Sequence, residues 1–257
     1  MTHPDLQTRH VQVNHDGLAI DAYVAQPAAD GVYPPVVVVQ EIFGVNAHIR
    51  DITERIAREG YIAIAPALYQ RFAPGFEAGY TLDDIKLGRQ YKDQTHVDEL
   101  LGDVQAAIDF LIQQPASQPG GVGCIGFCFG GHVAFLAATL PDVTATASFY
   151  GAGLPTWCPG GGDPSLSRTA DITGTLYAFF GMEDMSIPAE HVDQLEAALT
   201  AHHVPHQIFR YPDADHGFFC DRRASYQAEA AADAWQKVQD LFQRSLKDKP
   251  LALNSEA

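Results

Sequence analysis

A cysteine flanked by glycines is the residue whose type and setting point most directly to chemistry. The run Gly126-Phe127-Cys128-Phe129-Gly130 has the spacing of a nucleophile elbow, G-x-S-x-G, with cysteine in place of serine. Glycines two residues before and after the central residue relieve crowding where a strand reverses into a helix. The alternative is a glycine-rich turn holding an ordinary cysteine, because free cysteine often packs as a small apolar side chain. An accompanying base, acid and oxyanion site would favour the elbow.

Two residues with acid–base chemistry occur later in the chain, each after a segment expected to be a strand. Cys128, Asp184 and His216 stand in the order nucleophile, acid, base that an α/β-hydrolase requires. The imidazole of His216 suits the base, because its ordinary pKa of about 6.5 lets it accept and donate a proton near neutrality. Asp184 is preferred to the adjacent Glu183 as the acid because it completes a Gly-x-x-Asp turn that starts at Gly181.

The oxyanion site is expected from two backbone N–H groups, those of Phe129 and Ile42. Phe129 follows the candidate nucleophile, and Ile42 lies in the loop after the four-valine run at 36–39. Glu41 precedes Ile42 and is either a surface carboxylate or a group that holds the Cys128 thiol protonated until substrate displaces it. A thiolate forms beside a histidine cation or a helix N-terminus, and it suits activated acyl groups such as enol esters. Ordinary amides are not expected as substrates.

The elements that must position these residues alternate between strands and helices. Such alternation predicts a mostly parallel sheet with helices on both faces and a ligand site at the carboxyl ends of the strands. We expect one α/β-hydrolase domain over residues 1–257, with irregular excursions at 66–96 and 151–173. Strands are predicted at 11–13, 20–25, 36–39, 61–65, 123–127, 143–150, 176–180 and 206–211, and helices at 47–58, 97–112, 129–140, 189–202 and 226–246, before a frayed tail after Lys247.

Composition excludes several classes of protein. The net charge is −16, from 32 acidic and 16 basic residues that do not cluster, so nucleic acid is not an expected partner. Four cysteines in 257 residues do not form a disulfide framework. The first residues lack an apolar leader, and no segment is apolar over the roughly 18 residues that would span a bilayer. We therefore expect a cytoplasmic protein with no membrane partner, as a monomer or small homo-oligomer.

Four blocks of the chain resemble dienelactone hydrolase, also called carboxymethylenebutenolidase, and the likeness covers nearly the whole sequence. The blocks begin at Gln40, Pro66, Gly126 and His216: Gln-Glu-Ile-Phe-Gly-Val-Asn, Pro-Ala-Leu-Tyr, Gly-Phe-Cys-Phe-Gly-Gly and His-Gly-Phe. The resemblance implies a monomeric α/β-hydrolase that opens a dienelactone to maleylacetate without a cofactor or metal. It also implies the following roles: Cys128 nucleophile, His216 base, Asp184 acid, Glu41 control of the thiol, and Ile42 and Phe129 oxyanion donors.

The likeness is weaker at the substrate carboxylate. The family holds this group with two arginines, one after the second buried strand and one four residues beyond the catalytic histidine. Arg89 and Tyr91 are candidates for the first place, but Cys220 occupies the second. Arg222 or Arg223 is the substitute from nearby. The reaction class is therefore better specified than the substrate.

Other readings of the sequence stay open. The first is a cysteine-dependent hydrolase of a lactone or activated ester, and the second is an esterase for another small carboxyl ester. A third is a catalytically silent protein that binds a small ligand on the same fold, because a fold does not establish a function. Transfer of the acyl group to an acceptor other than water is a further alternative to hydrolysis.

Overall fold

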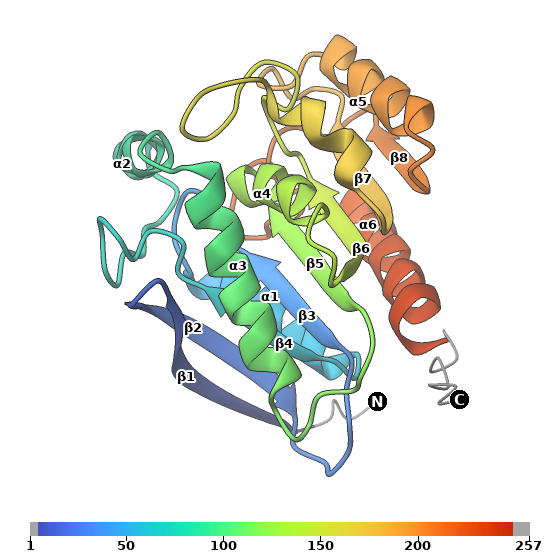
Figure 1. Cartoon of the computed structure of the whole chain (residues 1–257). Coiled ribbons are helices and arrows are strands. Elements are labelled where there is room, and N and C mark those ends of the chain that lie inside the picture. Colours follow the sequence, from blue (N-terminus) through green and yellow to red (C-terminus); the bar gives the residue numbers. More distant parts are fainter. Residues whose placement is uncertain (1–4, 249–257) are drawn as a thin grey trace.

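An eight-stranded sheet forms the centre of the computed structural model, which describes residues 5–248 (Figure 1). The strand order is β1-β2-β4-β3-β5-β6-β7-β8. β1 pairs with β2 and β2 with β4 in antiparallel fashion, whereas every later pairing is parallel. The strands are β1 (Leu6–His15), β2 (Leu18–Pro27), β3 (Pro35–Val39), β4 (Ile62–Pro66), β5 (Val122–Phe127), β6 (Val143–Phe149), β7 (Thr175–Gly181) and β8 (His206–Tyr211).

Helices cover both faces of this sheet. α1 and α6 pack on one face and α3 and α4 on the other, while α5 lies beside β8 (Figure 1). The α-helices are α1 (Ala47–Arg58), α2 (Leu82–Lys92), α3 (Val97–Ile112), α4 (Phe129–Ala137), α5 (Ala189–Ala201) and α6 (Ala228–Phe242); a 3₁₀ helix spans Ser165–Asp171 and a π-helical turn spans Gln243–Lys247.

The four-valine run shows why the central strands are apolar at every position. Val36 and Val38 belong to the core cluster that contains α1 and α6, whereas Val37 and Val39 belong to the cluster with α3 and α4. Successive side chains of a strand point to opposite faces of the sheet. In a strand whose sheet is covered on both faces, every side chain therefore lies in the core and is apolar. All four valines are fully buried, which stabilises the fold by about 1.5–3 kcal/mol each.

Most expected elements are present, with adjusted ends. The helix predicted at 97–112 coincides with α3, but the opening hairpin is longer than expected. The helix predicted at 129–140 ends at Ala137, and the one predicted at 226–246 runs as α6 and then changes to the π-helical turn. The expectation of a frayed tail falls mostly on residues 249–257, which lie outside the described residues.

The prediction that residues 66–96 are wholly irregular is wrong, because they include α2. Thr81 caps this helix: its hydroxyl accepts a hydrogen bond from the backbone N–H of Asp84, whose carboxylate accepts one from the backbone N–H of Thr81. Gly88 is the one buried residue of α2, and only Ile85 and Tyr91 pack partly buried against the core, so the apolar period by which helices are recognised is weak. Among residues 5–248, no helix combines the length and apolar character that would cross a membrane.

Candidate active site

The chain turns sharply between β5 and α4, and Cys128 stands at this turn. Its backbone has φ 57° and ψ −118°, a conformation that costs a non-glycine residue about 1–3 kcal/mol. The turn is held by a hydrogen bond from the Cys128 N–H to the carbonyl of Phe149 at 3.0 Å. A methyl group on Gly126 would overlap the carbonyl of Gly130, so glycine is required where the two arms of the turn meet. The local geometry is that of a nucleophile elbow.

Asp184 and His216 meet at the same edge of the sheet. Asp184 follows β7 and His216 follows β8, and the parallel pairing of these strands brings the two side chains together. His216 Nδ1 lies 2.6 Å from Asp184 Oδ2, and because an ionised carboxylate only accepts, Nδ1–H is the donor. Asp184 Oδ1 accepts from the backbone N–H of Ser186 at 2.8 Å, whereas the neighbouring Glu183 is exposed. The second imidazole nitrogen of His216, Nε2, is therefore not used in the contact with Asp184.

The neighbours of His216 favour the positively charged form of its imidazole. Burial disfavours the imidazolium, but the charge of Cys128, hydrogen bonds with Asp184 and Cys128, and the charge of Asp184 together raise the pKa of His216 to about 10. The ring of Tyr150 packs against the imidazole with the centroids 5.1 Å apart. Cys128 lies beside this imidazole and directly precedes the first residue of α4.

Glu41 lies in the loop after β3 and is fully buried. Its Oε1 faces the guanidinium of Arg223 at 3.4 Å, and its Oε2 has no hydrogen-bond partner among the described residues. Burial raises the pKa of Glu41, and the positive charges of Arg223 and His216 act in the opposite direction. Glu41 is thus an internal carboxylate electrically coupled to His216, and the surface alternative does not apply.

Backbone donors for an oxyanion are available beside Cys128. Phe129 is the first residue of α4, where an N–H has no carbonyl four residues earlier to bond within the helix. Ile42 lies in the loop after β3, and it and Phe129 both line the cavity that Cys128 and His216 line. Gly88 of α2 packs against the carbonyl of Ile42 so closely that a methyl group there would overlap it. α2 thus fixes the position of the Ile42 peptide.

The cavity over these residues has a volume of about 1120 Å³, enough for a small ligand. Arg89 and Lys92 of α2 and Arg222 and Arg223 of the segment after β8 line it, together with the acidic Asp215. Among the described residues Arg89 and Arg222 form no ion pair, so their charges are free to face an anion. Sequence analysis missed Lys92, whose ammonium lies 4.2 Å from the centroid of the Trp157 ring.

The set of residues that line the cavity differs from the prediction at two further aromatic residues. Tyr91 is not among the residues that line the cavity, and its ring packs with those of Tyr69, Phe72 and Phe76; its role in substrate binding stays a prediction. His132 lines the cavity, and the sequence analysis did not identify it.

The His132 ring is fixed by two hydrogen bonds. Nδ1 donates to the Ala152 carbonyl at 2.8 Å and Nε2 accepts from the Ser165 hydroxyl at 2.7 Å. Burial lowers the pKa of His132 to about 4. His132 is therefore a neutral part of the cavity wall near pH 7.

Comparison with known proteins identifies relatives over almost the whole chain. Residues 20–246 match the Dienelactone hydrolase family. A Synechocystis sp. protein named "Putative carboxymethylenebutenolidase" is 60% identical over 243 residues, covering 95% of this chain and 99% of that protein. The protein named "Carboxymethylenebutenolidase" from Pseudomonas putida is 31% identical over 239 residues, covering 92% of this chain and 96% of that protein.

A solved structure supports the same assignment. The crystal structure of a "Putative Dienelactone Hydrolase" from Klebsiella pneumoniae subsp. pneumoniae superposes with a TM-score of 0.83 at 33% identity. The match covers 93% of this chain and 99% of that one. The chain therefore has the α/β-hydrolase fold, is a hydrolase, and belongs to the dienelactone hydrolase family.

Proposed function

We propose that the protein hydrolyses a small lactone or activated carboxylic ester that carries a negative charge, with Cys128 as the nucleophile. The observation that carries the proposal is the convergence of Cys128, His216 and Asp184 at one edge of the sheet. The names of the relatives point to a dienelactone as the substrate class. The cationic groups in the cavity favour an anionic substrate over a neutral ester.

In the proposed first step, the Cys128 thiolate attacks the carbonyl carbon and forms a tetrahedral intermediate. The N–H groups of Ile42 and Phe129 stabilise the negative oxygen that develops. The intermediate collapses to a thioester when the carbon–oxygen bond of the ring or ester breaks, and the imidazolium of His216 donates its proton to the departing oxygen. An enolate is a good leaving group, so the modest donor strength of this imidazolium is sufficient.

In the second step His216 acts as a base on a water molecule. The water attacks the thioester, and cleavage of the carbon–sulfur bond returns the thiolate of Cys128. Asp184 keeps Nδ1 protonated, so that Nε2 is the nitrogen that accepts and donates protons. We assign Glu41 to the control of the Cys128 thiol, because its buried carboxylate is coupled to His216 and paired with Arg223.

Cys128→Ala tests the proposal. We expect kcat/KM for an enol-lactone to fall at least about 10⁴-fold, because the step through the thioester is lost. The measurement compares cis- and trans-dienelactones with simple aryl esters. Cys158→Ala is the matched control, since Cys158 is a buried cysteine outside the cavity.

Hydrolysis by the Cys128→Ala variant at the wild-type rate would refute the cysteine mechanism. A wild-type preference for neutral aryl esters over dienelactones would instead assign the protein to the simpler esterase alternative. Release of free acid in the presence of an added alcohol separates hydrolysis from acyl transfer.

A further inference from the structure

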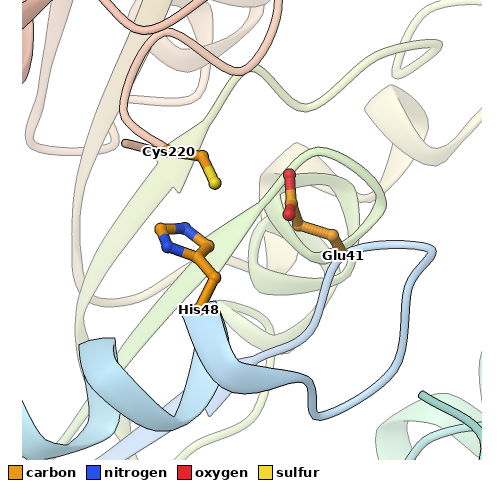
Figure 2. A group of neighbouring side chains, drawn as sticks. All are labelled: Glu41, His48 and Cys220. Atoms are coloured by element: carbon orange, nitrogen blue, oxygen red, sulfur yellow. The ribbon is translucent and has the colours of Figure 1, made fainter. Parts of the chain in front are cut away.

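Three side chains with metal-binding chemistry converge beside the candidate active site (Figure 2). Glu41 comes from the loop after β3, His48 from the first turn of α1 and Cys220 from the segment after β8. A carboxylate oxygen, an imidazole nitrogen and a thiol sulfur of these residues all lie within 4.8 Å of one another. The three residues are 0%, 2% and 0% exposed. The cluster combines one oxygen, one nitrogen and one sulfur donor in the protein interior.

Two atoms of this cluster have no hydrogen-bond partner among residues 5–248. They are Oε2 of Glu41 and Nε2 of His48, since Arg223 engages only Oε1 of the carboxylate. A buried polar atom left without a partner costs about 1–3 kcal/mol. The Cys220 thiol is weakly engaged, donating to the Tyr80 hydroxyl at 3.3 Å. A ligand between the three side chains would satisfy both unpartnered atoms at once.

We propose that Glu41, His48 and Cys220 bind a divalent transition-metal ion of the zinc class. Ca²⁺ and Mg²⁺ prefer oxygen ligands alone, whereas Zn²⁺ takes oxygen, nitrogen and sulfur together. Zinc bonds of about 2.0–2.3 Å require these donors to move inward by roughly 1 Å at most from their present separations. Three protein ligands leave the fourth tetrahedral position for water.

The surroundings provide an approach to the site and a group that supports the sulfur. A cavity of about 450 Å³ is lined by Asn46, His48, Tyr80 and Arg222, and it gives a path toward the cluster. Asn46 donates to the Tyr80 hydroxyl at 3.3 Å, which leaves the phenolic proton free to turn toward Cys220 once the thiol is ionised. In the binding step the metal–sulfur bond forms, the S–H bond breaks and the proton passes to solvent. One carboxylate and one thiolate then balance the charge of the ion.

Calorimetric titration with Zn²⁺ tests the site, in a Cys128→Ser background so that the reactive thiol does not contribute. We expect one ion per chain and release of about one proton, read from the binding heat in two buffers of different ionisation enthalpy. Co²⁺ in place of Zn²⁺ is expected to show a sulfur-to-cobalt charge-transfer band.

Single substitutions then assign the ligands. His48→Gln and Cys220→Ser, each added to the Cys128→Ser background, are expected to raise the Kd for Zn²⁺ at least about tenfold. Cys220→Ser is also expected to remove the charge-transfer band of the Co²⁺ form. His203→Gln, in an exposed turn, and Cys158→Ser are the matched controls and should leave Kd unchanged.

The proposal is overturned if Zn²⁺ does not bind, or if it binds with the same Kd to the His48→Gln and Cys220→Ser variants. Circular dichroism checks that each variant is folded. Should Cys220→Ser fail to fold, the His48→Gln comparison alone decides the outcome. The readout is binding, so it is independent of whether Cys128 is the nucleophile.

Discussion

At the scale of single residues, His216 is a group whose charge depends strongly on its surroundings. In an unfolded chain its imidazole titrates near the ordinary value of 6.5, whereas in the folded protein Cys128 and Asp184 raise its pKa to about 10. Between these two values the folded state binds more protons than the unfolded state. Folding therefore stabilises the imidazolium, and the imidazolium in turn stabilises the fold.

The pH dependence of stability follows from this linkage. The contribution of His216 is complete below about pH 6.5 and is lost as the pH rises to about 10, so we expect Tm to fall over that interval. Cys128→Ser removes the largest of the influences that raise the pKa, so its Tm should fall less steeply over the same interval. Thermal unfolding by circular dichroism measures both slopes. Parallel curves for the two proteins would contradict the coupling between His216 and Cys128.

The residues of the candidate site could be predicted because the ends of strands can be recognised in a sequence. Cys128, Asp184 and His216 each follow an apolar run, and parallel strands bring their carboxyl ends to one edge. The pairings between side chains within the site could not be predicted in this way. Arg222 and Arg223 are adjacent, yet only Arg223 pairs with Glu41 while Arg222 is exposed, and backbone direction in the loop decides between them.

At the scale of elements, α2 shows what the sequence pattern missed. A helix is recognised by an apolar face, and α2 presents exposed Leu82 and Leu87 and buries only Gly88 completely. The signal that was available is the capping box of Thr81 and Asp84. The helix is held by the contact of Gly88 with the Ile42 loop and by the partly buried Ile85 and Tyr91, which pack against the core, so the reason for its position lies in tertiary structure.

Gly88→Ala tests the role of α2 as a support for the Ile42 peptide. Alanine is a better helix former than glycine by about 1 kcal/mol, but here its methyl group overlaps the Ile42 carbonyl. We expect kcat to fall by about 10²-fold or more, since the proposed oxyanion donor Ile42 would be displaced, while KM changes less.

Steady-state kinetics on one activated ester measures this effect, with Lys86→Ala as the matched control. Lys86 is an exposed residue of the same helix and lies outside the cavity. Unchanged kcat in Gly88→Ala would mean that the Ile42 N–H takes no part in the transition state.

At the scale of the whole molecule, the sign of the charge differs between the surface and the cavity. The chain carries a net charge of −16, yet four of its 16 lysines and arginines line the cavity that Cys128 also lines. The overall field repels an anion at long range, where salt screens it beyond about 10 Å at 0.1 M. The cavity attracts the same anion at short range. A negatively charged substrate is therefore expected to bind better as moderate salt weakens the long-range repulsion.

Arg89→Ala separates the local attraction from the global field. Arg89 is exposed and forms no ion pair among residues 5–248, so its charge acts on a ligand without rearranging other pairs. We expect KM for an anionic ester to rise by about fivefold, the value of an exposed ion pair near 1 kcal/mol, and KM for a neutral ester of the same shape to stay constant. Lys86→Ala, on the same helix but outside the cavity, changes the net charge equally and is the matched control. An equal change in the KM for the anionic ester in the two variants would mean that the overall field of the protein, and not Arg89, determines the effect of the substrate's charge.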